Sequence, residues 1–298
     1  MVQFKISSFT LNFKFLGYVA FVVGGGVLDA ELYSPEGKCQ HKLAPLPAEI
    51  SYFPYLMVFR SQVIVCGLTP GQNCFVYDII KDSWSTTTSM PTSYQFGFPG
   101  SAYQEKFYLA QYQNAKVFDP TSNSWSSWAG VPINSGIYGC MVTLNDSFIY
   151  FGGEPAFNTV LQYSHLSHSW TNLPFSYPPI TVMSLPSCVV LPNQNVLVVS
   201  GITQLGNIYA VYNVTSNTWP NQTVGNTLHA YASAIVLGKR VFIISGSSVN
   251  DIEEFNYNTI SVTTKMFKLL TTRPLMPGSI ALPAYLFSHL PGGCLGVM

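Results

Sequence analysis

A pair of histidines is the first feature of this chain that could do chemistry. His165 and His168 form an H-x-x-H pair, and the remaining histidines are His41, His229 and His289. A protein-bound metal ion usually needs three or four protein ligands, and the spacing places no third ligand beside the pair. Both residues fall in a predicted turn, where solvated side chains are typical. We therefore expect no metal site and no cofactor.

Other catalytic motifs are missing from the sequence. It contains no G-x-S-x-G elbow, no Walker loop and no paired carboxylates among its 13 acidic residues. The glycines of GGGVLD at 24–29 could suggest a nucleotide-binding loop, but no helical pattern follows them. A second G-G at 152–153 likewise ends an apolar run. We expect no catalytic residues, so the chain is predicted not to be an enzyme.

The cysteines suggest one disulfide. Cys66 and Cys74 flank the segment GLTPGQN, so they would face each other across the base of a hairpin loop, where a bridge is geometrically reasonable. Cys140 and Cys188 occupy equivalent positions in two predicted strands, and we expect them to be buried thiols.

Composition excludes several classes of partner. The net charge is zero and only 9% of the residues are charged, whereas proteins that bind nucleic acid carry a basic surface. No apolar run reaches the roughly 18 residues that span a bilayer. We expect a monomer that binds neither nucleic acid nor membrane and instead recognises a protein partner of unknown identity.

The compartment stays open at this stage. The apolar run from Phe15 to Val23 follows a basic start and suits either a secretory signal peptide or an ordinary strand. Asn145, Asn213 and Asn221 each begin an N-x-S/T triplet, but this composition predicts as many by chance. A secreted and a cytoplasmic location both remain possible.

At four places in the chain, an aromatic residue is followed by tryptophan seven positions later. Glycine ends an apolar run upstream of most of these pairs. The aromatic pairs are Tyr77 and Trp84, Phe118 and Trp125, Tyr163 and Trp170, and Tyr212 and Trp219. The strand-ending glycines are Gly25, Gly67, Gly153, Gly201 and Gly246. With partial copies at Tyr33 and Phe255, the pattern recurs about every 45 residues, which indicates a repeat architecture.

Each repeat reads as four short strands, because β-branched and aromatic residues dominate the apolar runs and no helical period is visible. Such units stack radially as propeller blades. The order of a glycine doublet at 152–153, Tyr163 and Trp170 resembles the kelch repeat. The resemblance covers about 21–270, although the third unit lacks the glycine and the first and last units lack the tryptophan.

The predicted fold is therefore an all-β, six-bladed, kelch-type β-propeller of four-stranded antiparallel blades. We expect a segment at 1–20, which is either a signal peptide or a strand of the first blade, and a single domain at 21–298. The repeats fall at about 21–47, 52–91, 93–132, 135–176, 184–225 and 228–270, with a closing segment at 271–298. The aromatic and the tryptophan should lie on adjacent strands and fill the gap between blades.

The two ends of the chain compete for one blade. We predict that 273–298 pack in the same blade as 27–47, so that N- and C-terminal strands close it together and remove exposed edges. A bridge between Cys39 and Cys294 would then be possible in a secreted protein.

The remaining prediction concerns a binding face. Loops between second and third strands and between blades emerge at one end of a propeller, and loops carry function. The candidate partner-binding residues there are Tyr94, Phe96, Tyr112, Tyr138, Phe157, Tyr177 and Tyr231. Further loop positions on this face are Pro70, Gln72, Gln113, Glu154, Gln204, Leu205, Val249 and Asp251. These loops contain almost no arginine, and Arg273 is the exception.

These features favour a non-enzymatic protein-interaction propeller. The alternative is a degenerate propeller enzyme or small-ligand binder similar to galactose oxidase, acting through the central channel. That family needs a tyrosine crosslinked to cysteine and two histidine ligands.

Overall fold

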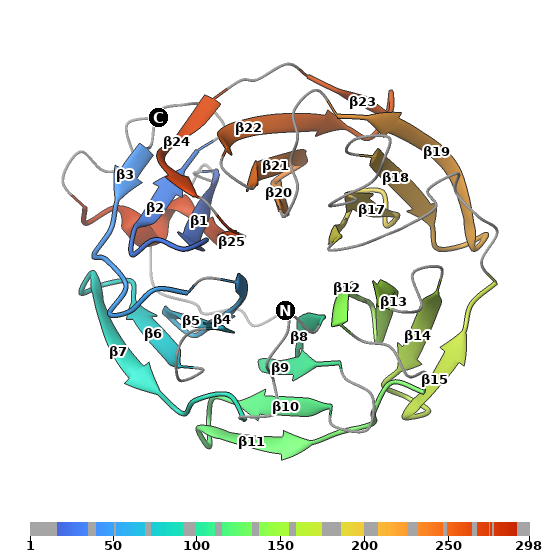
Figure 1. Ribbon diagram of the computed structural model, residues 1–298, viewed down its shortest axis with the longest axis horizontal. Coiled ribbons are helices and arrows are strands. Elements are labelled where there is room, and N and C mark those ends of the chain that lie inside the picture. Colours follow the sequence, from blue (N-terminus) through green and yellow to red (C-terminus); the bar gives the residue numbers. More distant parts are fainter. Residues whose placement is uncertain are drawn as a thin grey trace, which may run out of the picture.

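Six antiparallel sheets stand in a ring around a central channel, so the chain is an all-β, six-bladed β-propeller (Figure 1). The structure is a computed structural model. It describes residues 17–34, 40–50, 52–68, 73–91, 99–110, 115–132, 137–154, 159–174, 186–199, 208–225, 232–246, 249–263, 267–273, 275 and 277–290. No helix in these ranges is long and apolar enough to cross a bilayer.

Blades 2 to 5 each take four consecutive strands, ordered from the channel to the rim. Blade 2 contains β4 (Tyr52–Phe59), β5 (Gln62–Leu68), β6 (Cys74–Asp78) and β7 (Ser83–Thr87). Blade 3 contains β8 (Gly100–Tyr103), β9 (Lys106–Leu109), β10 (Lys116–Asp119) and β11 (Ser124–Ser127). Blade 4 contains β12 (Ile137–Leu144), β13 (Ser147–Glu154), β14 (Val160–Ser164) and β15 (Ser169–Asn172). Blade 5 contains β16 (Ser187–Val190), β17 (Val196–Val199), β18 (Ile208–Asn213) and β19 (Thr218–Val224).

Blade 6 and blade 1 depart from this scheme. Blade 6 contains β20 (Ser233–Leu237), β21 (Arg240–Gly246), β22 (Val249–Asn256), β23 (Ser261–Val262) and β24 (Phe267–Arg273), and both β23 and β24 pair with β22. Blade 1 contains β25 (Pro277–Pro283), β1 (Tyr18–Gly24), β2 (Ala30–Tyr33) and β3 (Gln40–Lys42), in that spatial order. A short 3₁₀ helix, η1 (Ala284–Phe287), follows β25.

The predicted closure of the ring is confirmed. β25 pairs with β1 along its whole length, from Tyr18 opposite Pro283 to Gly24 opposite Pro277. The C-terminal segment therefore supplies the innermost strand of blade 1, and the N-terminal segment supplies the other three. Cys39 and Cys294 lie outside the described residues.

The apolar run near the N-terminus belongs to the fold. Val19 to Val23 are wholly buried in β1, which is hydrogen-bonded to β25 on one side and to β2 on the other. Tyr18 to Gly24 thus form the second strand of blade 1, whereas Phe15 and Leu16 lie outside the described residues.

A side-chain-capped turn explains the recurring seven-residue spacing. Asp78 Oδ1 accepts the backbone N–H groups of Ile80 and Lys81 at 3.0 and 3.1 Å. The same turn position is filled in the later blades by Asp119, Ser164, Asn213 and Asn256. A residue with positive φ ends each turn, for example Asp82 at 48°. Because short polar side chains stabilise such turns, the loop length and hence the spacing stay constant.

In the four repeats that contain both, the aromatic residue and the tryptophan pack together across adjacent strands, as predicted. Tyr77 lies opposite Trp84 and Tyr163 opposite Trp170, with ring centroids 5.0 and 5.2 Å apart. These rings face the preceding blade, since Phe21 of β1 lies 5.2 Å from Tyr77. Six apolar clusters of described residues fill the six gaps between blades. The recurring aromatic residues and tryptophans are therefore part of the hydrophobic core between the blades.

The turn also clamps neighbouring blades together. Asp82 accepts the backbone N–H of Ala44, which follows the outer strand of blade 1, at 2.8 Å. Trp84 Nε1 donates to the carbonyl oxygen of the same Ala44 at 2.7 Å. In blade 2, the polar turn thus fixes the spacing within the blade and also the contact with blade 1.

Gly25 is needed where β1 leaves the sheet. Its φ is +79°, and a Cβ atom there would lie 3.0 Å from the Cβ atom of Arg273 and 3.1 Å from the carbonyl oxygen of Leu275. Larger residues would be strained in this conformation and would collide with the C-terminal segment. Of the other predicted glycines, Gly67, Gly153 and Gly246 lie in strands β5, β13 and β21, and Gly201 lies outside the described residues.

Candidate binding face and central channel

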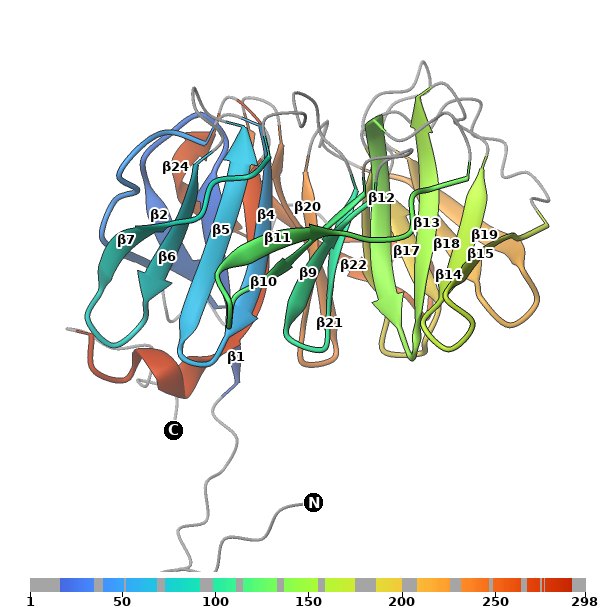
Figure 2. The ribbon, with the colours of Figure 1, turned by 90° about the horizontal axis from the view of Figure 1, so that it is seen from below.

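The two ends of the propeller differ in the length of their connections (Figure 2). At one end, first and second strands are joined by short turns such as 60–61, 104–105 and 145–146. At the other end, the chain between consecutive strands is longer, as in 88–99 and 173–186. η1 and the start of β1 lie at the end with the short turns (Figure 2). We call the opposite end the long-connection face.

The placement of the predicted partner-binding residues on the long-connection face stays a prediction. Tyr94, Phe96, Tyr112, Phe157, Tyr177 and Tyr231 lie outside the described residues. Tyr138 is the second residue of β12, and only its backbone is described. Their contact with a partner remains a prediction.

Two further loop assignments are wrong. Val249 and Asp251 were expected in a loop, but both lie in β22, and only 4% of Asp251 is exposed. The chain turns back earlier than the sequence suggested, because β22 begins within three residues of Gly246, the end of β21. Glu154 is the last residue of β13, and Pro70, Gln72, Gln113, Gln204 and Leu205 lie outside the described residues.

Arg273 is also misplaced by the sequence-based prediction. It was expected on the binding face, but its side chain is wholly buried at the end of β24. Its guanidinium donates to Glu31 Oε1 at 2.8 Å and to the backbone oxygen of Asp29 at 3.1 Å. Burial lowers the pKa of Arg273, and the neighbouring Glu31 carboxylate opposes that shift. The arginine therefore holds blade 6 against blade 1 and is not available to a ligand.

Buried polar side chains gather around this junction. Among the described residues, the buried polar or charged ones all belong to blades 1 and 6: Glu31, Ser34, Ser245, Asp251, Glu253 and Arg273. Glu253 faces blade 5, where it accepts the hydroxyl of the buried Tyr209 at 3.1 Å. Burial, followed by the charge of Glu253, raises the pKa of Tyr209. No sequence motif predicted the Arg273–Glu31 pair, since the two residues are 242 positions apart in the chain.

The central channel holds a cavity of about 190 Å³ where the innermost strands begin. All six blades contribute to its wall, mostly through proline, glycine, serine and alanine, and none of the described lining residues is charged. Ser233 and Ser279 hydrogen-bond to each other at 2.7 Å, and Ser187 accepts the backbone N–H of Ala234 at 2.9 Å. The serine hydroxyls of the wall are thus used to join neighbouring blades.

Cys140 and Cys188 were expected to be free buried thiols, but the structure joins them in a disulfide between blades 4 and 5. Cys140 lies opposite Phe151, one residue before the glycine doublet at 152–153. Cys188 lies opposite Val198, two residues before Ser200, which begins the corresponding segment of blade 5. The two cysteines are therefore offset by one residue within the repeat. A shift of one residue turns a side chain to the other face of a strand. The two sulfurs therefore point toward each other, with Cα atoms 5.9 Å apart.

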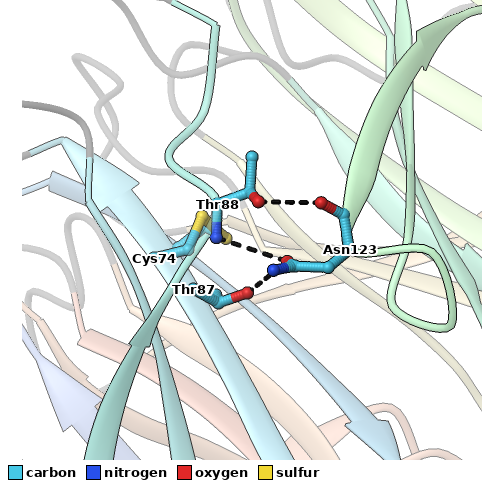
Figure 3. Close-up of a disulfide and its surroundings, with 5 residues drawn as sticks. Cys74, Thr87, Thr88 and Asn123 are labelled. Carbon is cyan, nitrogen blue, oxygen red and sulfur yellow. Dashed lines mark hydrogen bonds between the residues drawn. A yellow bond between two sulfur atoms is a disulfide. The ribbon is translucent and has the colours of Figure 1, made fainter.

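Cys66 and Cys74 form a second disulfide within blade 2, and their Cα atoms are 4.2 Å apart across β5 and β6. Cys74 lies opposite Thr87, the last residue of β7. Figure 3 shows Thr87 and Thr88 hydrogen-bonded to Asn123 of blade 3, with Thr88 Oγ1 donating to the Asn123 carbonyl at 2.7 Å. The disulfide therefore lies beside the contact between blades 2 and 3. No described cysteine is free.

No protein-family model matches this chain, and no curated protein matches it. The fold is therefore assigned from the structure, and the function has to be inferred from its surfaces.

His165 does not occupy the solvated position expected from the sequence. Its ring stacks on the ring of Tyr103 in blade 3, with the ring centroids 3.7 Å apart. It also contacts the ring of Phe148 edge-on, with the centroids 4.5 Å apart. Burial lowers the pKa of His165, Asp146 opposes this shift, and His168 adds to it. His168 ends the turn with a φ of 52°. In the described part of the chain, no three His, Cys, Asp or Glu residues group as metal ligands.

Proposed function

We propose that the chain is a non-enzymatic, kelch-type propeller that binds a protein partner through its long-connection face. The observation that carries this proposal is the asymmetry between the two ends of the ring. Short, side-chain-capped turns close one end, whereas the other end carries most of the sequence that is not needed for the blades. Connecting segments on a rigid scaffold are the usual place for recognition.

The composition of these connections supports a protein as the partner. They contain Tyr94, Phe96, Tyr112, Phe157, Tyr177 and Tyr231 and few charged residues. Tyrosine offers a large apolar ring and a polar hydroxyl with little side-chain entropy, and it is enriched at protein interfaces. The nearly neutral chain offers little to a polyanion.

The second candidate is a small-ligand binder that uses the central channel. The cavity of about 190 Å³ favours it, since this space could admit a small neutral molecule. Its wall consists mainly of small side chains and backbone, and the described cysteines nearby are bridged. We rank it below the interaction propeller because the described residues of the channel wall include no charged group for recognition or catalysis.

The test begins with affinity capture from cell extract and medium, followed by identification of the captured protein. The purified partner is then titrated against wild type and a Tyr94→Ser, Phe157→Ser double variant. Two lost aromatic contacts should weaken binding about tenfold or more, with no change in melting temperature.

A matched control lies at the opposite end. Ile80 and Leu166 are 60% and 83% exposed in short turns, so Ile80→Ser, Leu166→Ser should leave binding unchanged. Loss of binding in the control alone would contradict the assignment of the face. A stoichiometric transition metal in the purified protein would support the channel alternative instead.

A further inference from the structure

Three N-x-S/T triplets occur in the chain, and the structure separates them by what their asparagines do. Asn145 begins the two-residue turn between β12 and β13 with a φ of 52°, a conformation that asparagine tolerates better than most residues. Asn213 caps the turn after β18, where its Oδ1 accepts the backbone N–H groups of Thr215 and Ser216, both at 3.0 Å. Both asparagines therefore have a local structural role.

Asn221 has no such role. It lies in the middle of β19, the outer strand of blade 5, opposite Val211, and its side chain is exposed. Asparagine is depleted in strands, and within the described part of the chain Asn221 has no side-chain partner. The neighbouring Gln222 is exposed and Thr223 is half-buried, so the whole triplet lies at the rim.

The disulfides point to the compartment in which such a triplet is used. Cys66–Cys74 and Cys140–Cys188 are formed, and disulfides persist in oxidising compartments such as the secretory pathway and are rare in the cytosol. An N-x-S/T triplet is an N-glycosylation acceptor in secreted proteins. Of the three triplet asparagines, Asn221 is the one that neither forms nor caps a turn, which leaves its exposed side chain available for modification.

The edge of blade 5 gives a separate reason for covering this position. β19 has seven residues, more than β3, β7, β11 or β15, and like β7, β11 and β15 it carries no charged side chain; Pro220 removes one backbone donor, and the rest of its edge stays open. Val224 at its end is 58% exposed. Long, uncharged edge strands invite pairing with other chains unless something blocks them, and a bulky solvated group on Asn221 would do so.

We propose that Asn221 carries an N-linked glycan, added in an oxidising secretory compartment. The side-chain nitrogen of Asn221 bonds to the first sugar of a polyprenyl-diphosphate-linked oligosaccharide. The bond between that sugar and the diphosphate breaks, the amide loses one proton, and the lipid diphosphate leaves. No group is oxidised or reduced. A glycan at this rim leaves both ends of the ring free, so the proposal is independent of the binding face.

The experiment directs the full chain, behind a cleavable leader, into the secretory pathway of a eukaryotic cell. Protein from the medium and from the membrane fraction is treated with peptide-N-glycosidase, which converts a glycosylated asparagine to aspartate, and peptides are read by mass spectrometry. Thr223→Ala removes the acceptor triplet and Thr223→Ser keeps it. Asn213 serves as the internal control.

Wild type and Thr223→Ser should show aspartate at position 221 after treatment and a loss of mass, whereas Thr223→Ala should show neither. The peptide that contains Asn213 should keep its asparagine. Unmodified Asn221 in wild type from both fractions would overturn the proposal, and so would a glycan on Asn213 with Asn221 left bare.

Discussion

Replacing Arg273 by methionine should destabilise the protein by about 3–5 kcal/mol, the usual cost of breaking a buried ion pair by removing one partner. Both Arg273 and Glu31 are completely buried, and their side chains are 2.8 Å apart. The arginine also donates to Asp29, and Glu31 Oε2 accepts the backbone N–H of Leu270 at 2.8 Å. Without the guanidinium, one carboxylate oxygen keeps this single bond and the other faces an apolar gap.

The assay measures urea unfolding of the full chain, with tryptophan fluorescence as the signal. Glu31→Gln and the double variant complete a mutant cycle, in which the coupling free energy should be about 1–3 kcal/mol. A matched surface control is Lys106→Ala, because Lys106 pairs with Asp119 at 2.9 Å and is 46% exposed. That control should change stability far less, since exposed ion pairs contribute little.

The measurement has a clear contrary outcome. If Arg273→Met unfolds at the same urea concentration as wild type, the pair does not hold blades 1 and 6 together. If the double variant loses as much free energy of unfolding as the two single variants added together, the two side chains act independently.

Three further predictions follow from the core, the closure and the half-buried His165. Trp170→Ala should cost about 3 kcal/mol in a thermal melt, while Leu166→Ala in the same hairpin should cost little; equal melting temperatures would remove the tryptophan from the core. A chain ending at Leu270 lacks β25 and Arg273 and should lose cooperative unfolding; melting like the full chain would contradict the shared blade. The lowered pKa of His165 means that the unfolded state binds its proton first, so stability should fall as pH drops below about 6.5, and His165→Phe should flatten that fall in a pH series of melts.

Much of the fold could be predicted because its determinants are local. The turn cap at Asp78, the positive φ at Asp82 and the pair Tyr77–Trp84 lie within a few residues of each other, so their spacing is visible in the sequence. Repetition multiplies this evidence, since each blade meets the same physical demands. The candidate binding residues, by contrast, could be assigned only to an end of the ring, because strand direction decides where a connection emerges but not what its side chains touch.

Only the tertiary structure decided the contacts between distant segments. Arg273 meets Glu31 because closure brings the end of blade 6 onto blade 1, and the local sequence of β24 contains no sign of that contact. The disulfide between Cys140 and Cys188 depends on a one-residue offset between two strands of different blades. His165 is half-buried because Tyr103, the last residue of β8 in blade 3, stacks on its ring. The sequence determines which side chains a strand presents, but their partners depend on how six blades are rotated and aligned around one axis, which is settled only when the ring closes.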